Sequence, residues 1–218
     1  IIEGLYPDGK SQVTVRYENN VPVSIDNIIV STHHSNRYKE DNQFEILKSK
    51  IINHVVSYAI PQELLPDNAS IIINPNGPWY KSGGPAADTG VTGRKIIADT
   101  YGGFARHGGG AFSGKDATKV DRSGAYMARK LARSIVQNGY ADECEIQLGF
   151  AIGKSKPISR AVKTFGTEKV SIEKIQQFIF ENSDITLSQM IDNLNLREPR
   201  FEELSNYGHF GRDEFIWS

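Results

Sequence analysis

Residues 12–30 read QVTVRYENNVPVSIDNIIV, two alternating stretches joined by a short polar one. Alternation of polar and apolar residues is typical of a strand with one face on a core and the other in solvent. The polar link, Glu18-Asn19-Asn20, has the composition of a tight turn. The stretch therefore predicts a β-hairpin with strands at 12–17 and 23–30.

The residues that follow predict a helix and a third strand. Between 41 and 59 apolar side chains recur three or four positions apart, as on an amphipathic helix, and Pro61 ends the pattern. The apolar run 71–73 predicts a short buried strand. Two strands, a helix and a strand indicate an α/β fold, of the α+β two-layer sandwich kind.

The second half of the chain has elements of the same kind. Periodic apolar residues predict a helix, two strands and two further helices. These elements cover 121–138, 145–152, 160–165, 171–180 and 187–194. Asp121 or Ser123 can cap the first of these helices. The order β-β-α-β, then β-α-β-β-α-α, indicates two sandwich units of similar build, and we place the domains at 1–80 and 81–218.

Composition excludes several classes of protein. The net charge of −1 gives no general attraction to nucleic acid or to an anionic membrane, and no run of 18 apolar residues occurs that could cross a bilayer. The single cysteine, Cys144, excludes an internal disulfide and suits a reducing compartment. We therefore expect a cytoplasmic protein without nucleic-acid or membrane partners. The alternation around Cys144 predicts a buried strand position rather than a nucleophile.

A segment between the two halves is unusually rich in glycine. Residues 74–114 hold eleven of the chain's 20 glycines. Such density indicates a backbone that turns sharply or approaches a ligand closely. Trp79, Tyr80, Tyr101 and Phe104 are interleaved with the glycines, whereas a flexible linker lacks such large anchors. The composition therefore predicts an ordered binding loop.

Cationic residues gather in and after this loop. From Asp88 to Arg133 there are nine Lys and Arg residues and four Asp residues. Lys115, Lys119 and Asp121 stand where a helix is predicted to begin, and a helix N-terminus adds N–H donors and a partial positive charge. Glycines, lysines and a carboxylate match the needs of a Mg²⁺-polyphosphate. The alternative for the lysines is a solvated helix face.

Residues 107–116, HGGGAFSGKD, contain the G-x-x-x-x-G-K pattern of a P-loop. A P-loop continues with Ser or Thr, whereas this chain has Asp116, and residues 104–108 do not form the apolar strand that precedes a P-loop. We therefore reject a P-loop and keep the polyphosphate interpretation.

Two other kinds of catalytic site are not indicated. The five histidines lack the spacing of a zinc site, so we expect them to be structural or hydrogen-bonding. Ser113 does not lie in the G-x-S-x-G elbow of a hydrolase.

Several long motifs follow one another in a characteristic order. They are PDGKSQV at 7–13, GGPAADTGVTGRK at 83–95, DTYGG at 99–103, HGGGAFSGKDATKVDRS at 107–123 and YGHFGR at 207–212. Together they closely resemble the S-adenosylmethionine synthetase (methionine adenosyltransferase) family, over essentially the whole chain. The number and order of the motifs make the resemblance specific.

The resemblance implies a fold and a reaction. The fold is a set of repeated α/β domains with flat sheets packed by helices, interleaved in the full protein. The methionine sulfur attacks C5′ of ATP, and the released triphosphate is hydrolysed to pyrophosphate and phosphate. Two Mg²⁺ ions and K⁺ are implied as cofactors, with the K⁺ site outside this chain. A homodimer or homotetramer would form the active site between subunits, with ATP and L-methionine as ligands.

The resemblance also assigns contacts with the phosphate chain to a group of cationic residues. They are Lys10, Arg94, Lys95, Lys115 and Lys119. Lys10 matches the lysine beside the scissile bond, and it counts as catalytic together with Arg94, Lys95 and Lys115. Lys115 and Lys119 match the lysines that clamp the phosphates.

Five further residues match substrate and metal positions of the family. Asp8 matches a residue near the adenosine, and Asp88 matches the aspartate that faces the methionine amino group and the ribose. Tyr80 takes the place of the phenylalanine that stacks on adenine, and Ile152 matches a residue that packs near it. Asp121 matches the metal-binding aspartate.

The chain also departs from the family pattern. Ala87 replaces a common glycine, and no His-Pro-Asp-Lys segment, which supplies a histidine and a second metal-binding aspartate, occurs in the sequence. Because this segment is absent and the sequence begins at Ile1 without Met, we expect either the central and C-terminal part of a longer synthetase or a chain whose first part was lost or disordered. Two alternatives are a non-catalytic regulatory or scaffolding homologue and a general polyphosphate-binding module. The retained charged residues favour the enzyme.

Overall fold

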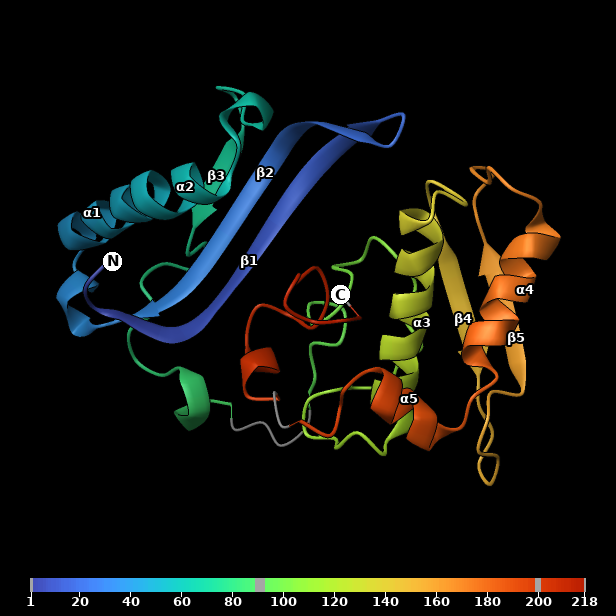
Figure 1. Ribbon diagram of the computed structural model, residues 1–218. Helices are drawn as coiled ribbons and strands as arrows, with labels where there is room; N and C mark the ends of the chain where they lie inside the picture. The colour runs from blue at the N-terminus through green and yellow to red at the C-terminus, as the bar shows by residue number, and fades with distance from the viewer. Residues whose placement is uncertain (1, 89–92, 199–200, 218) are drawn as a thin grey trace. The chain divides into compact units, whose positions relative to one another are not determined.

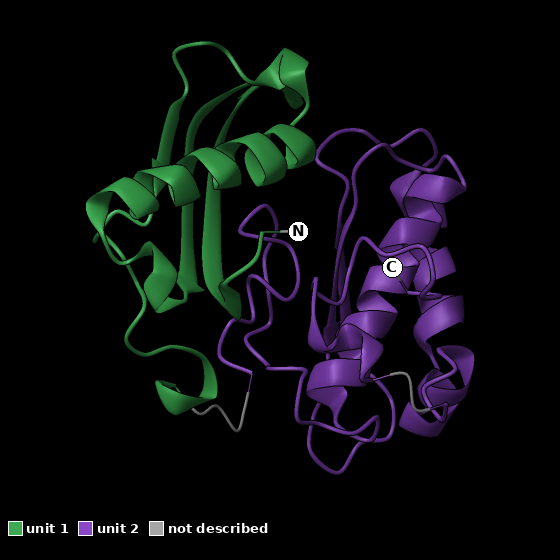
Figure 2. Ribbon diagram, turned by 90° about the vertical axis from the view of Figure 1, so that its left-hand side faces the viewer, with its two compact units in different colours: residues 1–90 green, residues 91–218 purple. Residues whose placement is uncertain are grey.

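The computed structural model describes residues 2–88, 93–198 and 201–217 of the chain (Figure 1). The chain divides into two compact units, unit 1 with residues 1–90 and unit 2 with residues 91–218 (Figure 2). Residues 81–90, which the sequence interpretation places in the second domain, fall in unit 1 in this division. The fold is α/β, with a small sheet packed by helices in each unit, as predicted.

Unit 1 is built on the predicted hairpin. β1 (Leu5–Glu18) pairs antiparallel with β2 (Val21–His34), and Asn19 and Asn20 form the turn with φ values of 50° and 63°. Asparagine tolerates positive φ better than most residues, and a turn of this kind suits the twist of a hairpin. Each strand has 14 residues, so the pairing extends well beyond the predicted bounds.

A parallel strand completes the sheet of unit 1. β3 (Ser70–Ile73) lies beside β2, in the order β1-β2-β3. Parallel neighbours require a crossover connection. The predicted helix provides it as a continuous stretch of α1 (Asp41–Ile51), a π-helical turn (Ile52–Val56) and α2 (Ser57–Ala59), which runs along one face of the sheet (Figures 1 and 2).

The core of unit 1 lies between this helical stretch and the sheet. Phe44, Leu47 and Ile51 are buried, at the spacing of one helix face. They pack with Ile73 of β3 and Val30 of β2. Burying each such side chain contributes roughly 1.5–3 kcal/mol, so this layer holds the helical stretch on the sheet.

Unit 2 places helices against a two-stranded antiparallel sheet. The strands are β4 (Glu145–Gly149) and β5 (Ser159–Lys163). The helices are α3 (Val120–Gln137), α4 (Ile172–Ser183) and α5 (Leu187–Asn193). In Figure 1, α3 lies beside β4 and α4 beside β5.

One of two buried hydrophobic clusters among the described residues of unit 2 joins its two long helices to the sheet. Ile135 of α3 and Ile175 and Ile179 of α4 are buried in one cluster with Ile146 and Val162. Ile146 and Val162 are direct partners across β4 and β5, so they point to the same face.

Single 3₁₀ turns also occur in the described chain, at Asn36–Tyr38, Gln62–Leu64, Gly84–Ala86 and Glu203–Ser205.

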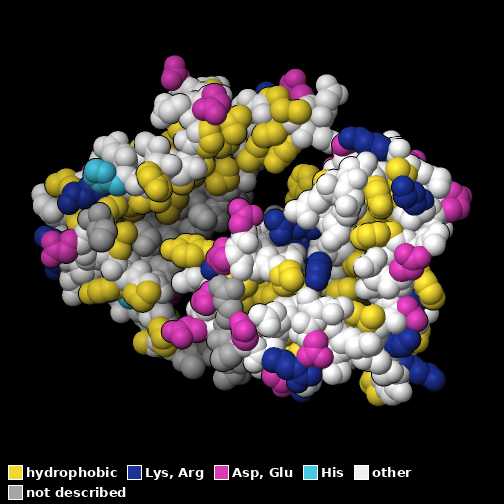
Figure 3. All heavy atoms as spheres, viewed as in Figure 1, with side chains coloured by type: hydrophobic (Ala, Val, Ile, Leu, Met, Phe, Trp, Pro, Cys, Tyr) yellow, Lys and Arg dark blue, Asp and Glu magenta, His cyan; other side chains and the backbone are white. Residues whose placement is uncertain are grey.

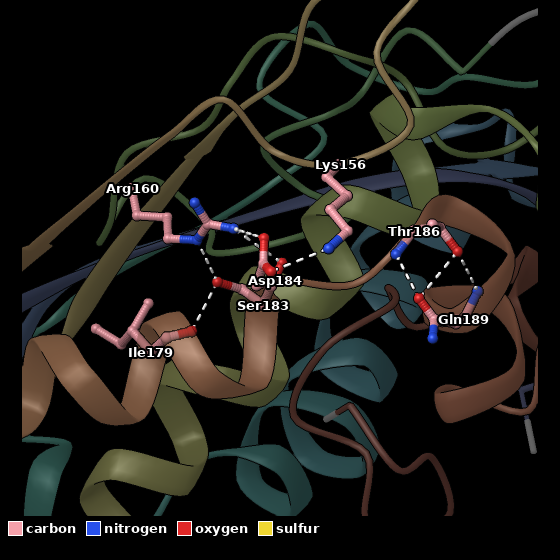
Figure 4. A network of polar contacts seen from close by, with 7 residues as sticks. All are labelled: Lys156, Arg160, Ile179, Ser183, Asp184, Thr186 and Gln189. Atoms are coloured by element: carbon pink, nitrogen blue, oxygen red, sulfur yellow. Dashed lines mark hydrogen bonds and ion pairs between the residues drawn. The ribbon is translucent and has the colours of Figure 1, made fainter.

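Polar contacts fix the turn between α4 and α5 (Figure 4). Arg160 of β5 donates from Nε to the Ser183 hydroxyl at 2.6 Å, and its guanidinium lies 3.3 Å from Asp184. Thr186 and Gln189 form a reciprocal capping box at the start of α5. These contacts satisfy backbone groups at both helix ends, and the Arg160 bonds tie the end of α4 to the sheet.

Three details differ from the sequence prediction. α3 begins at Val120 without a side-chain cap, because the N-cap residue is Lys119, whose side chain cannot accept a hydrogen bond, and both Asp121 and Ser123 lie within the helix; Asp121 pairs with Lys115 and Ser123 bonds to the carbonyl of Lys119. Cys144 is half-buried just before β4 rather than within it. No strand precedes α3 in the described part of unit 2, although the predicted order began with one.

The surface of unit 2 carries charges of both signs. Figure 3 shows dark-blue and magenta side chains interspersed on the face of unit 2 that it presents. Among the residues that the structure describes, no helix is both long enough and apolar enough to cross a bilayer.

Candidate functional site

The glycine-rich loop before α3 has neither a strand nor an α-helix in its described residues, 93–119. Gly109 and Gly114 adopt φ values of +94° and +89°, which residues with a side chain rarely do. Gly110 lies against Asp121, since a Cβ atom on Gly110 would come within 2.6 Å of the Asp121 Cβ. Glycine at this position lets the loop lie on the first turn of α3.

Lys115 and Asp121 form an ion pair at this contact. Nζ of Lys115 lies 2.6 Å from Oδ2 of Asp121, in the first turn of α3, where the helix N-terminus favours negative charge. The Lys115 side chain is 27% exposed and that of Asp121 is 58% exposed. The pair therefore adds little stability, and both groups can reach a ligand from solvent.

Asp116 forms the turn that leads into α3. Its Oδ1 accepts a hydrogen bond from the Thr118 backbone N–H at 2.7 Å and another from the Thr118 hydroxyl, and Nζ of Lys119 lies 3.3 Å from its Oδ2. These bonds, those from Thr118 first, lower the pKa of the Asp116 carboxyl to about 2. The residue that breaks the P-loop pattern is thus a turn former.

A cavity of about 310 Å³ lies beside the loop, within unit 2. The rings of Tyr101, Phe112 and Phe150 line it together with Gly110 and Asp121. Its size is at the lower end of the range for small-ligand sites. The loop therefore sets a charged pair next to a largely apolar hollow.

A buried polar network behind the loop is the part of the site that sequence reasoning missed. Arg122 is 2% exposed and His209 is 1% exposed. Nη1 of Arg122 donates to the Lys115 carbonyl at 2.7 Å. Sequence reasoning counted Arg122 only among the cationic residues. The available signal was its spacing of four from Tyr126, which puts both side chains on one face of α3.

Stability of the chain is expected to fall in acid because of His209. Burial, with Arg122 and Arg212 nearby, lowers the pKa of His209 from 6.5 to about 4. Below pH 6.5 the unfolded chain binds a proton at this residue that the folded chain does not, so the free energy of unfolding falls by up to about 3 kcal/mol between pH 6.5 and 4. Urea unfolding at several pH values measures this decline. His209→Gln should make it shallower, and an unchanged slope would contradict the expectation.

In unit 1, β1 and the Gly83-Gly84 turn come together. Oδ2 of Asp8 accepts a hydrogen bond from the Gly84 N–H at 2.6 Å. Gly83 packs on His33, where an added Cβ would lie 2.5 Å from the ring Nδ1. Lys10, two residues after Asp8 on β1, is exposed. The pairing thus holds one predicted substrate residue in place and leaves a predicted catalytic lysine accessible.

His34 fixes the segment that carries Tyr80. The ring Nε2 of His34 accepts a hydrogen bond from the backbone N–H of Trp79 at 3.0 Å. The backbone N–H of His34 donates to the Trp79 carbonyl at 2.9 Å. The ring Nδ1 lies 3.0 Å from the Ser35 carbonyl, to which it donates. His34 is fully buried and has the hydrogen-bonding role expected from the sequence, so Tyr80 follows an anchored residue.

Comparison with known proteins identifies the family. The sequence model of the central domain of S-adenosylmethionine synthetase matches residues 1–79, and that of its C-terminal domain matches residues 82–218. The chain belongs to the S-adenosylmethionine synthetase family. It is 48% identical over 212 residues to the S-adenosylmethionine synthase of Kosmotoga olearia, and the match covers 97% of this chain and 52% of that protein. The chain thus spans about half the length of this curated relative.

The residues that resemble the synthetase site are divided between the two units. Those of unit 1 are Asp8, Lys10, Tyr80 and Asp88, and those of unit 2 are Arg94, Lys95, Lys115, Lys119, Asp121 and Ile152. The structure brings together Lys115 and Asp121, whereas Lys119 turns to Asp116. Ile152 is fully exposed in the turn after β4. Residues 89–92 of the synthetase motif lie outside the described residues.

One carboxylate in the first turn of α3 has the chemistry to bind a magnesium ion that arrives with substrate phosphates. No group of three or more His, Cys, Asp or Glu side chains that could hold a metal occurs within 2–88, 93–198 and 201–217. Mg²⁺ in phosphate-transfer sites needs only one or two carboxylates, since substrate phosphates and water supply its other ligands. Asp121, half-exposed beside Lys115, has the chemistry of such a single ligand.

Proposed function

We propose that this chain is part of an enzyme that makes S-adenosylmethionine from ATP and L-methionine. The methionine sulfur forms a bond to C5′ of ATP as the bond from C5′ to the triphosphate oxygen breaks, and water then cleaves the triphosphate to pyrophosphate and phosphate. The observation that carries the proposal is the Lys115–Asp121 pair between the glycine loop and the first turn of α3, within the region that matches the synthetase C-terminal domain. Membership of the family supports it.

In this proposal the cations of unit 2 hold the triphosphate. Lys115 leaves Asp121 when phosphate oxygens arrive, because a polyanion offers it several acceptors in place of one carboxylate. Arg94, Lys95 and Lys119, all exposed, add donors for the charge that develops on the leaving group. Asp121 would hold Mg²⁺, which neutralises phosphate charge when it is bound; two Mg²⁺ ions and K⁺ are proposed for the whole enzyme.

The residues of unit 1 are proposed to orient the reactants. Lys10 would face the phosphate chain near the bond that breaks, and Asp8 the adenosine. Tyr80 would stack on adenine, and Asp88 would bind the methionine amino group; Ile152, which belongs to unit 2, is proposed as a separate adenine contact. Displacement of this kind needs two substrates in line rather than a protein nucleophile, which agrees with a site composed of cations, carboxylates and an aromatic ring.

A homodimer or homotetramer with shared active sites is also proposed. The sheet face of unit 1 opposite α1 presents Ile29 and Ile72, which are direct neighbours across β2 and β3. Ile72 is 36% exposed, so the face retains apolar surface for a partner. Sedimentation of the purified protein would measure the oligomeric state.

The chain alone is expected to show no methionine-dependent release of phosphate from ATP. It has no His-Pro-Asp-Lys segment, and the family draws a histidine and a metal ligand from that segment. Phosphate and pyrophosphate release, measured with and without methionine, tests this expectation. Turnover by the purified chain would contradict it.

A fusion protein separates the enzyme from a regulatory homologue. We define the chimaeric synthase as the Kosmotoga olearia enzyme in which residues 1–218 of this chain replace the half that they match. The enzyme proposal predicts S-adenosylmethionine formation by this protein. A folded chimaeric synthase that binds no ATP would favour the regulatory or scaffolding homologue.

A further inference from the structure

A chain of buried polar groups connects α3, the C-terminal segment and the glycine loop. Nε of Arg122 lies 3.0 Å from the Tyr126 hydroxyl, and this hydroxyl lies 2.6 Å from Nδ1 of His209. Nε2 of His209 lies 3.3 Å from the Ser113 hydroxyl. Tyr126 is fully buried, and Arg122 and His209 nearly so. The chain of contacts therefore ends on the loop, two residues before Lys115.

The direction of each hydrogen bond follows from donor chemistry. A guanidinium only donates, so the Tyr126 oxygen accepts from Arg122. Burial raises the pKa of Tyr126 to about 12, so its hydroxyl keeps its one proton and donates it to Nδ1 of His209. Nδ1 is then without a proton, and the neutral ring carries its proton on Nε2. From there it donates to the Ser113 hydroxyl.

Arg122, at the other end of the network, forms hydrogen bonds to the same loop. Nη1 of Arg122 donates to the carbonyl of Lys115 at 2.7 Å and lies 3.4 Å from that of Phe112. The backbone N–H of Lys115 donates to the Phe112 carbonyl at 3.1 Å, which closes the turn between these residues. The Phe201 ring packs 3.6 Å from Cζ of Arg122. Residues 112–115 are thus held at Ser113 from one side and at Lys115 from the other.

The chemistry of Arg122 indicates a geometric role. A buried cation lowers stability unless its donors are satisfied. No carboxylate pairs with Arg122 among the residues that the structure describes, and its partners are carbonyls, a phenol and a ring. Its donors are therefore taken up by groups that fix geometry and not by a neutralising charge. An apolar side chain could fill the same space, but it would not fix the two loop carbonyls.

We propose that Arg122, Tyr126 and His209 are positioning residues that hold residues 112–115 so that Lys115 lies beside Asp121. They touch no substrate themselves. As a statement about catalysis the proposal rests on the proposed function, because it sets where the Lys115 ammonium meets the triphosphate. As a statement about the loop it can be tested on the chain alone.

Two measurements on the chain test the network without any activity. Nitrogen NMR of labelled histidine should show His209 protonated at Nε2 and not at Nδ1 at pH 7. Hydrogen exchange should show a protected Lys115 amide that exchanges at least tenfold faster in Tyr126→Phe and in Ser113→Ala. The control is Tyr140→Phe, because Tyr140 packs on Phe178 in a hydrophobic cluster that does not contain Phe112 or Tyr126. A proton on Nδ1 of His209 would overturn the proposal. So would a Lys115 amide that is as well protected in both variants as in the unmodified chain.

The chimaeric synthase tests the catalytic part. Tyr126→Phe should lower kcat about tenfold and leave KM for methionine within twofold, while Tyr140→Phe leaves both unchanged. Loss of kcat equal in the two variants would mean a general loss of stability and would contradict positioning. An inactive parent chimaera would instead count against the proposed function, and the exchange and NMR results would still decide whether the network holds the loop.

Discussion

Replacing Lys115 by alanine in the chimaeric synthase should lower kcat about 100- to 1,000-fold, the usual loss for one charged or hydrogen-bonding group that stabilises a developing anion. Lys115 is held beside Asp121 at 2.6 Å and is expected to transfer from this carboxylate to the triphosphate oxygens. The effect should lie mainly in kcat, because the charge on the leaving group is largest in the transition state. Formation of S-adenosylmethionine under saturating substrates measures it.

Lys163→Ala provides the matched control. Lys163 is an exposed lysine at the end of β5, outside the glycine loop and the cavity beside it. It should leave kcat unchanged. Because the Lys115–Asp121 pair is partly exposed to solvent, Lys115→Ala should also leave the melting temperature within a few degrees of the parent. A loss of activity that follows a loss of folding would contradict the assigned role.

Replacing Asp121 by asparagine should raise the Mg²⁺ concentration needed for half-maximal activity at least tenfold and lower kcat about 100-fold. The amide keeps the shape of the side chain against Gly110 but removes the charge that a magnesium ion requires. It also leaves Lys115 without its partner in the absence of substrate. Activity measured against Mg²⁺ at fixed ATP tests this expectation.

Asp116→Asn separates a metal role from a structural one. Asp116 lies in the same loop, but both its oxygens are occupied by Thr118 and Lys119. The asparagine can still form the turn, so the magnesium dependence should match that of the parent. A shift in magnesium dependence equal to that of Asp121→Asn would show that Asp121 is not the specific ligand.

Local patterns predicted most of the fold. The alternation in 12–30 predicted the hairpin, and the period of the apolar residues predicted the helical stretch from 41 to 59. Such signals depend on neighbours within a few residues, so they survive without tertiary information. The extent of β1 was harder to predict, since Pro7-Asp8-Gly9 has the composition of a turn; the register with β2 is irregular between Leu5 and Gly9, and pairing resumes at Gly9 because β2 lies alongside.

Long-range contacts explain what the sequence did not reveal in the candidate site. Tyr126 and His209 are 83 residues apart, and no local pattern marks their contact. An arginine is usually exposed, so the sequence gives no reason to expect that Arg122 is buried; in the tertiary fold it is buried against the Phe201 ring. Lys115 and Asp121 were predicted as separate ligands for phosphate and metal. Their pairing depends on the close packing of Gly110 on Asp121. A glycine in the sequence allows such packing but does not show which residue it packs against.

The most direct test of the account is product formation by the unmodified chimaeric synthase. With ATP, methionine, Mg²⁺ and K⁺, we predict one phosphate and one pyrophosphate released for each S-adenosylmethionine formed. The reaction should depend on methionine and should fall about 100- to 1,000-fold with Lys115→Ala. A folded chimaera that forms no S-adenosylmethionine, while the Kosmotoga olearia enzyme does so under the same conditions, would contradict it.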